Sequence, residues 1–266
     1  YWESVLRQNV IRVPQGCPTL EKAMALAVVF SEKKEYTKAD PLKIVLEKGV
    51  HEIVGYTDED DDNHKMVNVT CSHITFVGKG KDHTTIRGGF EVKNQQNVQI
   101  EGLTVTNPSD IGLDLEGGET NVDLLKCIVK GCGGHGMWMG AGVTGTATQC
   151  EFMENVGHGV YCRGANTKAR LNDCTMHHNI DAGLMADRHA VMDLHGAKTD
   201  IHSNKDDGIH ASGRAKVNIH LPSQHNTSHD NVGEDRHQWG GGSIANINAD
   251  GTFTHVVVEE EDDDDN

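Results

Sequence analysis

The sequence predicts an all-β protein, a right-handed, single-stranded parallel β-helix with an N-terminal α-helical cap. The first observation behind this prediction is a glycine that precedes an aliphatic residue or methionine and returns after 24, 23, 24 and 25 residues, at Gly112, Gly136, Gly159, Gly183 and Gly208. The second is that apolar residues alternate with other residues on both sides of this glycine, as in strands with one buried face. A repeat of this length is typical of a solenoid and accommodates three short strands with their corners in each coil.

The composition agrees with this fold class. The 266-residue chain contains 30 glycines and only 5% aromatic residues, which favours many short strands over helices packed on large side chains. Its net charge of −16 argues against nucleic acid and anionic membrane surfaces as partners. No apolar run reaches the roughly 18 residues that a membrane-spanning helix requires.

The N-terminal residues predict a cap on the first coil. A strand is expected at residues 10–13, and a helix is expected from Pro18 onward with Thr19 as its N-cap. Residues 42–46 and 50–54 are apolar and β-branched, so they predict the next two strands. A helix at this end would cover apolar side chains and a sheet edge that an open solenoid would expose.

We expect a single domain over residues 1–266. Its predicted segments are the cap and first coil at 1–55, the repeat coils at 65–221, a C-terminal loop and closing segment at 222–258, and an acidic tail at 259–266. Residues 222–236 are expected to lose the repeat and form a loop, and Trp239 is expected to be an apolar plug over the last coil. The acidic run at 58–62 is expected to be a solvated loop.

Two features of the repeat are expected to shape its corners. The recurring glycine is expected to allow a corner with positive φ. Asn155, Asn179 and Asn204 each stand four residues before a repeat glycine. We expect their side chains to stack inside one corner and to hydrogen-bond along the solenoid, because the backbone of a turn has few partners of its own.

Cys127, Cys150 and Cys174 share a further repeat position. Side chains at this position would point the same way into the core, which is a poor geometry for disulfides. Buried, unbridged thiols indicate a reducing compartment, so we expect a cytoplasmic protein. Two glycosylation-type triplets, at Asn68 and Asn226, leave a secreted or organellar protein as the alternative.

The recurring pattern Asn-x-x-x-Gly-(Ile/Val/Leu)-x-(apolar) resembles the repeats of the pectin-lyase-like superfamily of parallel β-helices. The resemblance covers about residues 65–220, and residues 13–20 and 44–51 are similar to the N-terminal cap of many such proteins. It implies the fold without implying an activity, because the superfamily includes lyases, hydrolases, epimerases, phage adhesins and non-catalytic modules. Function therefore has to be sought in the side chains that the fold exposes.

The side chain two residues after each repeat glycine should point outward, which gives a column of Asp114, Trp138, Tyr161, Met185 and His210. Trp138 and Tyr161 on neighbouring coils would stack on sugar rings, with Asp114 and Arg163 as flanking polar contacts. We therefore expect a protein that binds a polysaccharide and, by extension, processes it. The alternative is a non-catalytic scaffold or protein-interaction module that uses the same β face.

The sequence leaves catalysis open. The residues best suited to acid–base chemistry or charge stabilisation are Asp187, Arg188, His210 and Asp207. Polygalacturonase-like hydrolysis is not expected, because the segment Gly134-His135-Gly136 precedes the aspartate pair Asp206-Asp207 instead of following it. Superfamily lyases use calcium-binding acids, so the resemblance leaves calcium as an option, although no motif in this chain specifies it.

Twelve of the 17 histidines lie between His135 and His237. His135 and His158 both stand next to a repeat glycine, so they should be neighbours on adjacent coils. No histidine spacing matches a zinc motif, so we expect corner or surface histidines and predict no metal. A metal-dependent site built from these histidines is the third alternative.

Overall fold

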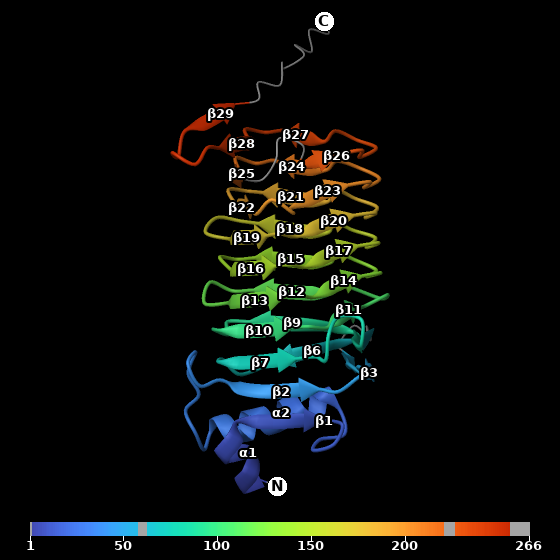
Figure 1. The fold of residues 1–266 in the computed structure, drawn as a ribbon, viewed down its shortest axis with the longest axis vertical. Coiled ribbons are helices and arrows are strands. Elements are labelled where there is room, and N and C mark those ends of the chain that lie inside the picture. Colours follow the sequence, from blue (N-terminus) through green and yellow to red (C-terminus); the bar gives the residue numbers. More distant parts are fainter. Residues whose placement is uncertain (1, 58–62, 221–226, 256–266) are drawn as a thin grey trace, which may run out of the picture.

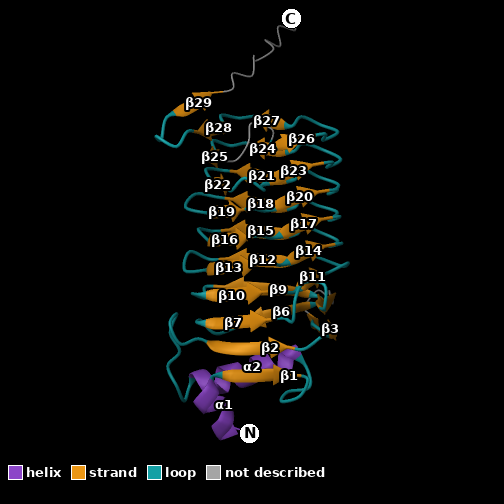
Figure 2. Cartoon of the chain, viewed as in Figure 1, coloured by secondary structure: helices purple, strands orange, loops and turns teal. Residues whose placement is uncertain are grey.

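The chain forms a parallel β-helix whose coils stack along one axis, with helices α1 (Trp2–Gln8) and α2 (Leu20–Ser31) at the N-terminal end (Figures 1 and 2). The computed structural model describes residues 2–57, 63–220 and 227–255. In the regular coils the chain visits three parallel sheets in turn, which we call the first, second and third sheets. In the described part of the chain, no helix is long and apolar enough to cross a membrane.

The strands are distributed among the sheets as follows. The first sheet contains β1 (Val10–Val13), β2 (Leu42–Leu46), β7 (Ile74–Val77), β10 (Val98–Glu101), β13 (Asn121–Leu125), β16 (Thr144–Thr148), β19 (Lys168–Asn172), β22 (Val191–His195), β25 (Lys216–His220), β28 (Ser243–Ile247) and β29 (Phe253–His255). The second contains β3 (Gly49–Glu52), β8 (Thr84–Arg87), β11 (Thr104–Thr106), β14 (Ile128–Lys130), β17 (Glu151–Met153), β20 (Thr175–His177), β23 (Asp200–His202) and β26 (Ser228–His229). The third contains β6 (Met66–Val69), β9 (Gly89–Lys93), β12 (Leu113–Glu116), β15 (Met137–Gly140), β18 (Val160–Arg163), β21 (Leu184–Asp187), β24 (Ile209–Ala211) and β27 (Arg236–Gln238). A separate antiparallel pair joins β4 (Tyr56–Thr57) to β5 (Asn63–His64), and the predicted acidic loop at 58–62 lies outside the described residues.

The core lies inside the coil and is built by the alternation that the sequence shows. In β19, for example, Ala169 and Leu171 are buried while Lys168 and Arg170 face outward. Strands one coil apart pair in parallel and in register, so every inward residue stacks on its equivalent in the next coil. This stacking turns narrow three-sided coils into one continuous apolar core, which no single coil could form alone.

The cap follows the prediction closely. Thr19 caps α2 by accepting a hydrogen bond from the Lys22 backbone N–H at 3.3 Å, and the helix buries its apolar face over the first coil. Strands β1 and β2 have the predicted bounds, but β3 ends at Glu52, and Val54 is 76% exposed. Helix α1 was not anticipated from the sequence.

The predicted asparagine stack is confirmed and is longer than expected. The Nδ2 atoms of Asn155, Asn179 and Asn204 each donate to the Oδ1 atom of the next asparagine along the axis at 2.9 Å. The last acceptor is Asn231. Each Oδ1 also accepts the backbone N–H of the preceding asparagine, at 3.1 to 3.2 Å. The ladder therefore satisfies corner groups that the sheets leave unpaired.

The role predicted for the repeat glycine is wrong. None of Gly112, Gly136, Gly159, Gly183 and Gly208 has a positive φ. A Cβ atom at Gly136 would instead lie 2.6 Å from the Gly159 carbonyl oxygen, and one at Gly159 would lie 2.7 Å from the Gly183 oxygen. Glycine is required there because the backbone of the next coil passes too close for any side chain.

Residues 222–236 do not simply leave the repeat. Residues 221–226 are outside the described part of the chain, but β26 and β27 then add another coil. Asn231 takes its place in the ladder 27 residues after Asn204. This longer spacing hid the coil from a search for a period of 23 to 25 residues.

The sequence also predicted an apolar plug at Trp239 and buried, unbridged cysteines. Trp239 is 71% exposed, so it is not an apolar plug; β28 and the antiparallel β29 stand at the C-terminal end instead. All seven cysteines are free and buried, including Cys127, Cys150 and Cys174, for which this was predicted. Cys127 and Cys150 stack one coil apart, with the Cys127 backbone N–H 3.5 Å from the Cys150 sulfur. The predicted acidic tail lies outside the described residues.

The steric role of the repeat glycine can be tested with Gly159→Ala. The new methyl group would meet the Gly183 oxygen and, at 2.9 Å, the Asn179 amide nitrogen. We expect the free energy of unfolding to fall by about 1–3 kcal/mol, as is typical for overpacking. The matched control is Gly118→Ala, whose Cβ would meet its nearest neighbour at 3.7 Å. Urea unfolding followed by circular dichroism should separate the two variants, and equal stability would contradict this role.

Candidate functional site

The outward column predicted from the sequence lies on the third sheet. Strand register aligns Asp114 with Trp138, Trp138 with Tyr161, Tyr161 with Met185, and Met185 with His210. His237 on β27 pairs with His210 and extends the column by one coil. Each of these side chains is partly exposed, so the third sheet presents a line of neighbouring functional groups along the axis.

The side chain of Trp138 extends along its own strand. A Cβ atom added to Gly140 would come within 2.3 Å of the Trp138 ring, so the indole covers the Cα of that glycine. The ring is therefore held against the sheet while remaining partly exposed. A partly exposed indole is suited to stacking on a flat apolar face of a ligand.

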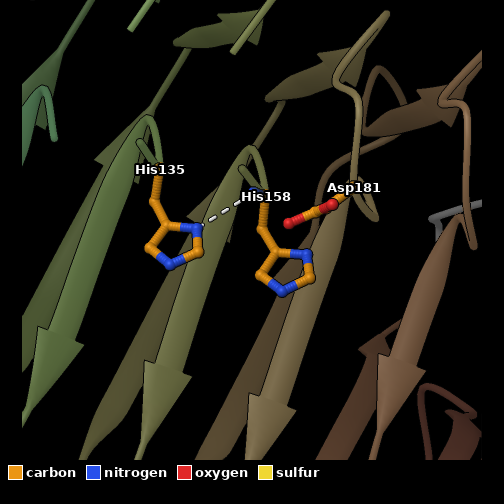
Figure 3. A group of neighbouring side chains, drawn as sticks. All are labelled: His135, His158 and Asp181. Carbon is orange, nitrogen blue, oxygen red and sulfur yellow. Dashed lines mark hydrogen bonds between the residues drawn. The ribbon is translucent and has the colours of Figure 1, made fainter. Parts of the chain in front are cut away.

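Tyr161 stands against a pair of histidines from the preceding corner. The rings of His135 and His158 are stacked, with centroids 5.1 Å apart and planes 2° from parallel (Figure 3). Tyr161 meets both edge-on, at 5.1 and 5.3 Å. Burial, and then the charge of Asp187, raises the pKa of the Tyr161 hydroxyl, so the phenol stays protonated as a donor.

The backbone fixes the tautomer of both histidines. The His158 backbone N–H donates to His135 Nδ1 at 3.0 Å, and the Ala182 backbone N–H donates to His158 Nδ1 at 3.1 Å. Because each Nδ1 accepts, the proton of the neutral ring has to lie on Nε2. Burial lowers the pKa of His135 and, together with His135 and His210, lowers that of His158 to about 3. The pair thus supplies two parallel, uncharged Nε2–H donors.

Asp181 lies beside this pair (Figure 3). Its carboxylate and the two imidazoles each offer an atom within 4.8 Å of the others. Burial is the main reason that the pKa of Asp181 is raised, and His135 opposes that effect. Asp181 was not singled out in the sequence, since it is not part of any repeat column.

Asp187, the last residue of β21, is the centre of a charged cluster with Arg163 from β18 and with Arg188. Its Oδ2 atom lies 3.6 Å from the Nε atoms of both Arg163 and Arg188, and its Oδ1 atom accepts a hydrogen bond from Ser212 at 2.9 Å. The structure thus brings together two predicted catalytic residues, Asp187 and Arg188, and the predicted binding residue Arg163. The carboxylate is already engaged, which suits it to holding charge and orienting the arginines.

Asp207, also predicted as catalytic, contacts His210 and a histidine that was not selected from the sequence. Its Oδ2 atom lies 2.9 Å from His210 Nδ1 and 2.8 Å from His237 Nδ1, and its Oδ1 atom accepts the Glu234 backbone N–H at 2.9 Å. Asp207 is 5% exposed. His237 was missed because the last coil is longer than the others.

The N-terminal end of the face is acidic. Burial, and then the neighbouring Glu91 and Glu116, raises the pKa of Asp114 to about 6. Lys93 forms an ion pair with Glu116 at 2.6 Å. Asp114 is therefore on the predicted face, one strand away from Trp138, but in an environment dominated by carboxylates.

A comparison with known protein families agrees with the β-helix architecture. Residues 88–254 match the family described as the right handed beta helix region, so the chain belongs to the right-handed β-helix family and the predicted fold is confirmed. No curated protein sequence matches the chain. The ORF18 structure of Geobacillus virus E2 aligns with a TM-score of 0.52 and 12% identity, over 93% of this chain and 62% of that one.

A second similar structure is the A-module of mannuronan C-5 epimerase AlgE6 from Azotobacter vinelandii. It aligns with a TM-score of 0.40 and 11% identity, over 88% of this chain and 78% of the module. This chain spans less than two thirds of the length of the ORF18 protein. At 12% identity the likeness to the ORF18 structure shows the fold alone.

The neutral state of His158 predicts a dependence of stability on pH. The imidazole of an unfolded chain titrates at about 6.5, whereas burial lowers the pKa of the folded His158 to about 3. Between these values the unfolded chain binds a proton that the folded chain does not, so stability is lost as the pH falls. His158→Asn keeps an acceptor for the Ala182 N–H but removes the titration.

We expect the unfolding free energy of the wild type, minus that of His158→Asn, to become smaller as the pH falls. Below about pH 6.5, where the unfolded histidine titrates, the decrease should be about 1.4 kcal/mol per pH unit. Urea unfolding of both proteins at several pH values down to about 4 measures it. A difference that does not change with pH would show that His158 takes up protons in the folded protein.

Proposed function

We propose that the outer face of the third sheet binds a polysaccharide chain. The observation that carries this proposal is the placement of Trp138 and Tyr161 on adjacent paired strands, with both rings partly exposed. Aromatic side chains commonly supply the stacking surfaces of binding sites, while a few fixed polar groups orient the ligand.

The polar groups beside these rings are suited to hydroxyl groups. His135 and His158 offer two parallel Nε2–H donors one coil apart, which are held neutral and in one tautomer by backbone hydrogen bonds. Arg163, on the same strand as Tyr161, adds a charged donor. Because the groups are spread over several coils along the axis, the face favours an extended, linear ligand over a compact one.

The charge of the protein favours one class of polysaccharide. The chain carries a net charge of −16, and the β9–β12 end of the face holds Glu91, Asp114 and Glu116. Long-range repulsion would weaken the binding of polyanions. We therefore assign the face to a polysaccharide of mainly uncharged residues.

We extend this proposal to chemical processing of the bound polysaccharide. His210, with Nδ1 held by Asp207, would leave Nε2 as a proton acceptor. Asp187 with Arg188 would stabilise developing charge. These roles rest on side-chain geometry, and binding does not depend on them.

The binding proposal is tested by affinity electrophoresis and calorimetry with neutral glucans, xylans and mannans, and with polygalacturonate and alginate as polyanions. We expect Trp138→Ala and Tyr161→Ala each to weaken binding about tenfold, in keeping with about 0.5–1.5 kcal/mol for an aromatic contact beyond its buried area. Gly140→Ala should weaken it as well, because the new methyl group displaces the Trp138 ring.

The matched control is Phe253→Ala, which removes a 61% exposed aromatic ring from β29 in the first sheet. Its affinity should equal that of the wild type. Equal losses in all four variants, or no binding of any glycan by the wild type, would overturn the proposal and favour the non-catalytic interaction module.

A further inference from the structure

The cluster at Asp207 has a geometry that hydrogen bonding by a single histidine does not explain. Two imidazoles, from the paired positions His210 and His237 on β24 and β27, direct the same atom, Nδ1, at one oxygen, Oδ2 of Asp207. Their ring centroids are 4.4 Å apart with an angle of 36° between planes. The three possible donor atoms all lie within 4.8 Å of one another.

The distances in this cluster are close to those of ligands on one metal ion. Two ligand atoms at about 2.0–2.1 Å from an ion stand about 2.9 Å apart at a right angle, and about 3.3 Å apart at the tetrahedral angle that Zn²⁺ prefers. The two Nδ1–Oδ2 distances are 2.9 and 2.8 Å. An ion would therefore displace the two hydrogen bonds: the ligand atoms would separate by about half an ångström, and each ring would turn its Nδ1 lone pair from the oxygen toward the ion.

The other cluster of possible ligands, His135, His158 and Asp181, cannot offer its imidazoles to an ion in the same way. His135 and His158 use their Nδ1 lone pairs to accept backbone N–H groups, and this places the protons on Nε2. An ion at Nε2 would force a proton onto Nδ1, against the backbone N–H. His210 and His237 face a carboxylate oxygen at Nδ1 and meet no such obstacle.

The surroundings of Asp207 hold its carboxylate in place and leave the two histidines partly open to solvent. Its carboxylate is 7% exposed and is oriented by the Glu234 backbone N–H on Oδ1, the kind of outer contact that positions metal ligands. The side chains of His210 and His237 are 21% and 35% exposed. Water therefore has access to the coordination positions that the protein leaves open.

We propose that Asp207, His210 and His237 form a binding site for a divalent first-row transition metal ion. Two imidazoles and one carboxylate suit Zn²⁺, Co²⁺ or Ni²⁺, whereas Ca²⁺ and Mg²⁺ prefer oxygen ligands. Three protein ligands with open positions resemble catalytic rather than structural metal sites. The site is independent of glycan binding by Trp138 and Tyr161. An ion on Nδ1 of His210 would place the ring proton on Nε2, so in the metal-bound protein His210 would be a ligand and not a proton acceptor.

The test uses the whole chain, first stripped with a chelator and then titrated with Co²⁺ and with Zn²⁺. Binding is followed by the visible absorption of Co²⁺ and by calorimetry with Zn²⁺. We expect one ion per chain to bind with both imidazoles as ligands. His237→Gln and His210→Gln should each weaken binding at least about 100-fold, since even loss of an outer-shell partner costs about 10–100-fold.

The control variant is His229→Gln, because His229 is also held by carboxylates but through opposite nitrogens. Its Nδ1 atom meets Asp230 at 2.8 Å and its Nε2 atom meets Asp200 at 3.0 Å, so these groups cannot converge on one ion. Its affinity for Co²⁺ should equal that of the wild type. Equal losses in His229→Gln and His237→Gln, or no saturable binding by the wild type, would overturn the proposal.

Folding of the variants is checked by their thermal unfolding without metal. Added Zn²⁺ should raise the unfolding temperature of the wild type and of His229→Gln, because a ligand that binds only the folded state stabilises it. It should not raise that of His237→Gln. A Zn²⁺-dependent rise in a folded His237→Gln protein would also contradict the site.

Discussion

The in-register stacking of one coil on the next is the constraint on which the rest of the structure depends. A single coil cannot bury its apolar side chains or pair its backbone, so each coil needs the same positions of its neighbour. The asparagine ladder through Asn155, Asn179, Asn204 and Asn231 extends that pairing into a corner. The repeat glycines allow the close approach, because a Cβ at Gly136 or Gly159 would collide with the next coil.

The functional face is a consequence of the same register. Stacking places residues that are about 24 positions apart in the chain side by side, with strands about 4.8 Å apart. It also lets the backbone of one coil set the chemistry of another, since the Ala182 N–H determines which nitrogen of His158 carries the proton. Side chains on this face are therefore oriented by the scaffold itself, which lowers the entropy lost when a ligand binds.

The two proposed sites occupy different stretches of one sheet. The aromatic groups and the neutral imidazole pair belong to β15, β18 and the corners before them, whereas the Asp207 cluster belongs to β24, β27 and their corners. Between them lies Asp187 with Arg163, Arg188 and Ser212. An ion at the Asp207 cluster would add positive charge to a face whose other end is acidic.

The sequence by itself determined the fold, the asparagine stack, the unbridged cysteines and the outward column, because neighbours in a solenoid are encoded by a constant separation along the chain. Only the tertiary structure showed that the repeat glycine has a steric role, that Trp138 covers Gly140, and that Asp207 meets a second imidazole from His237. It also showed that Trp239 is exposed. These features depend on side-chain rotamers, on the distance between backbones and on a last coil of unequal length, and none of the three follows from a regular period.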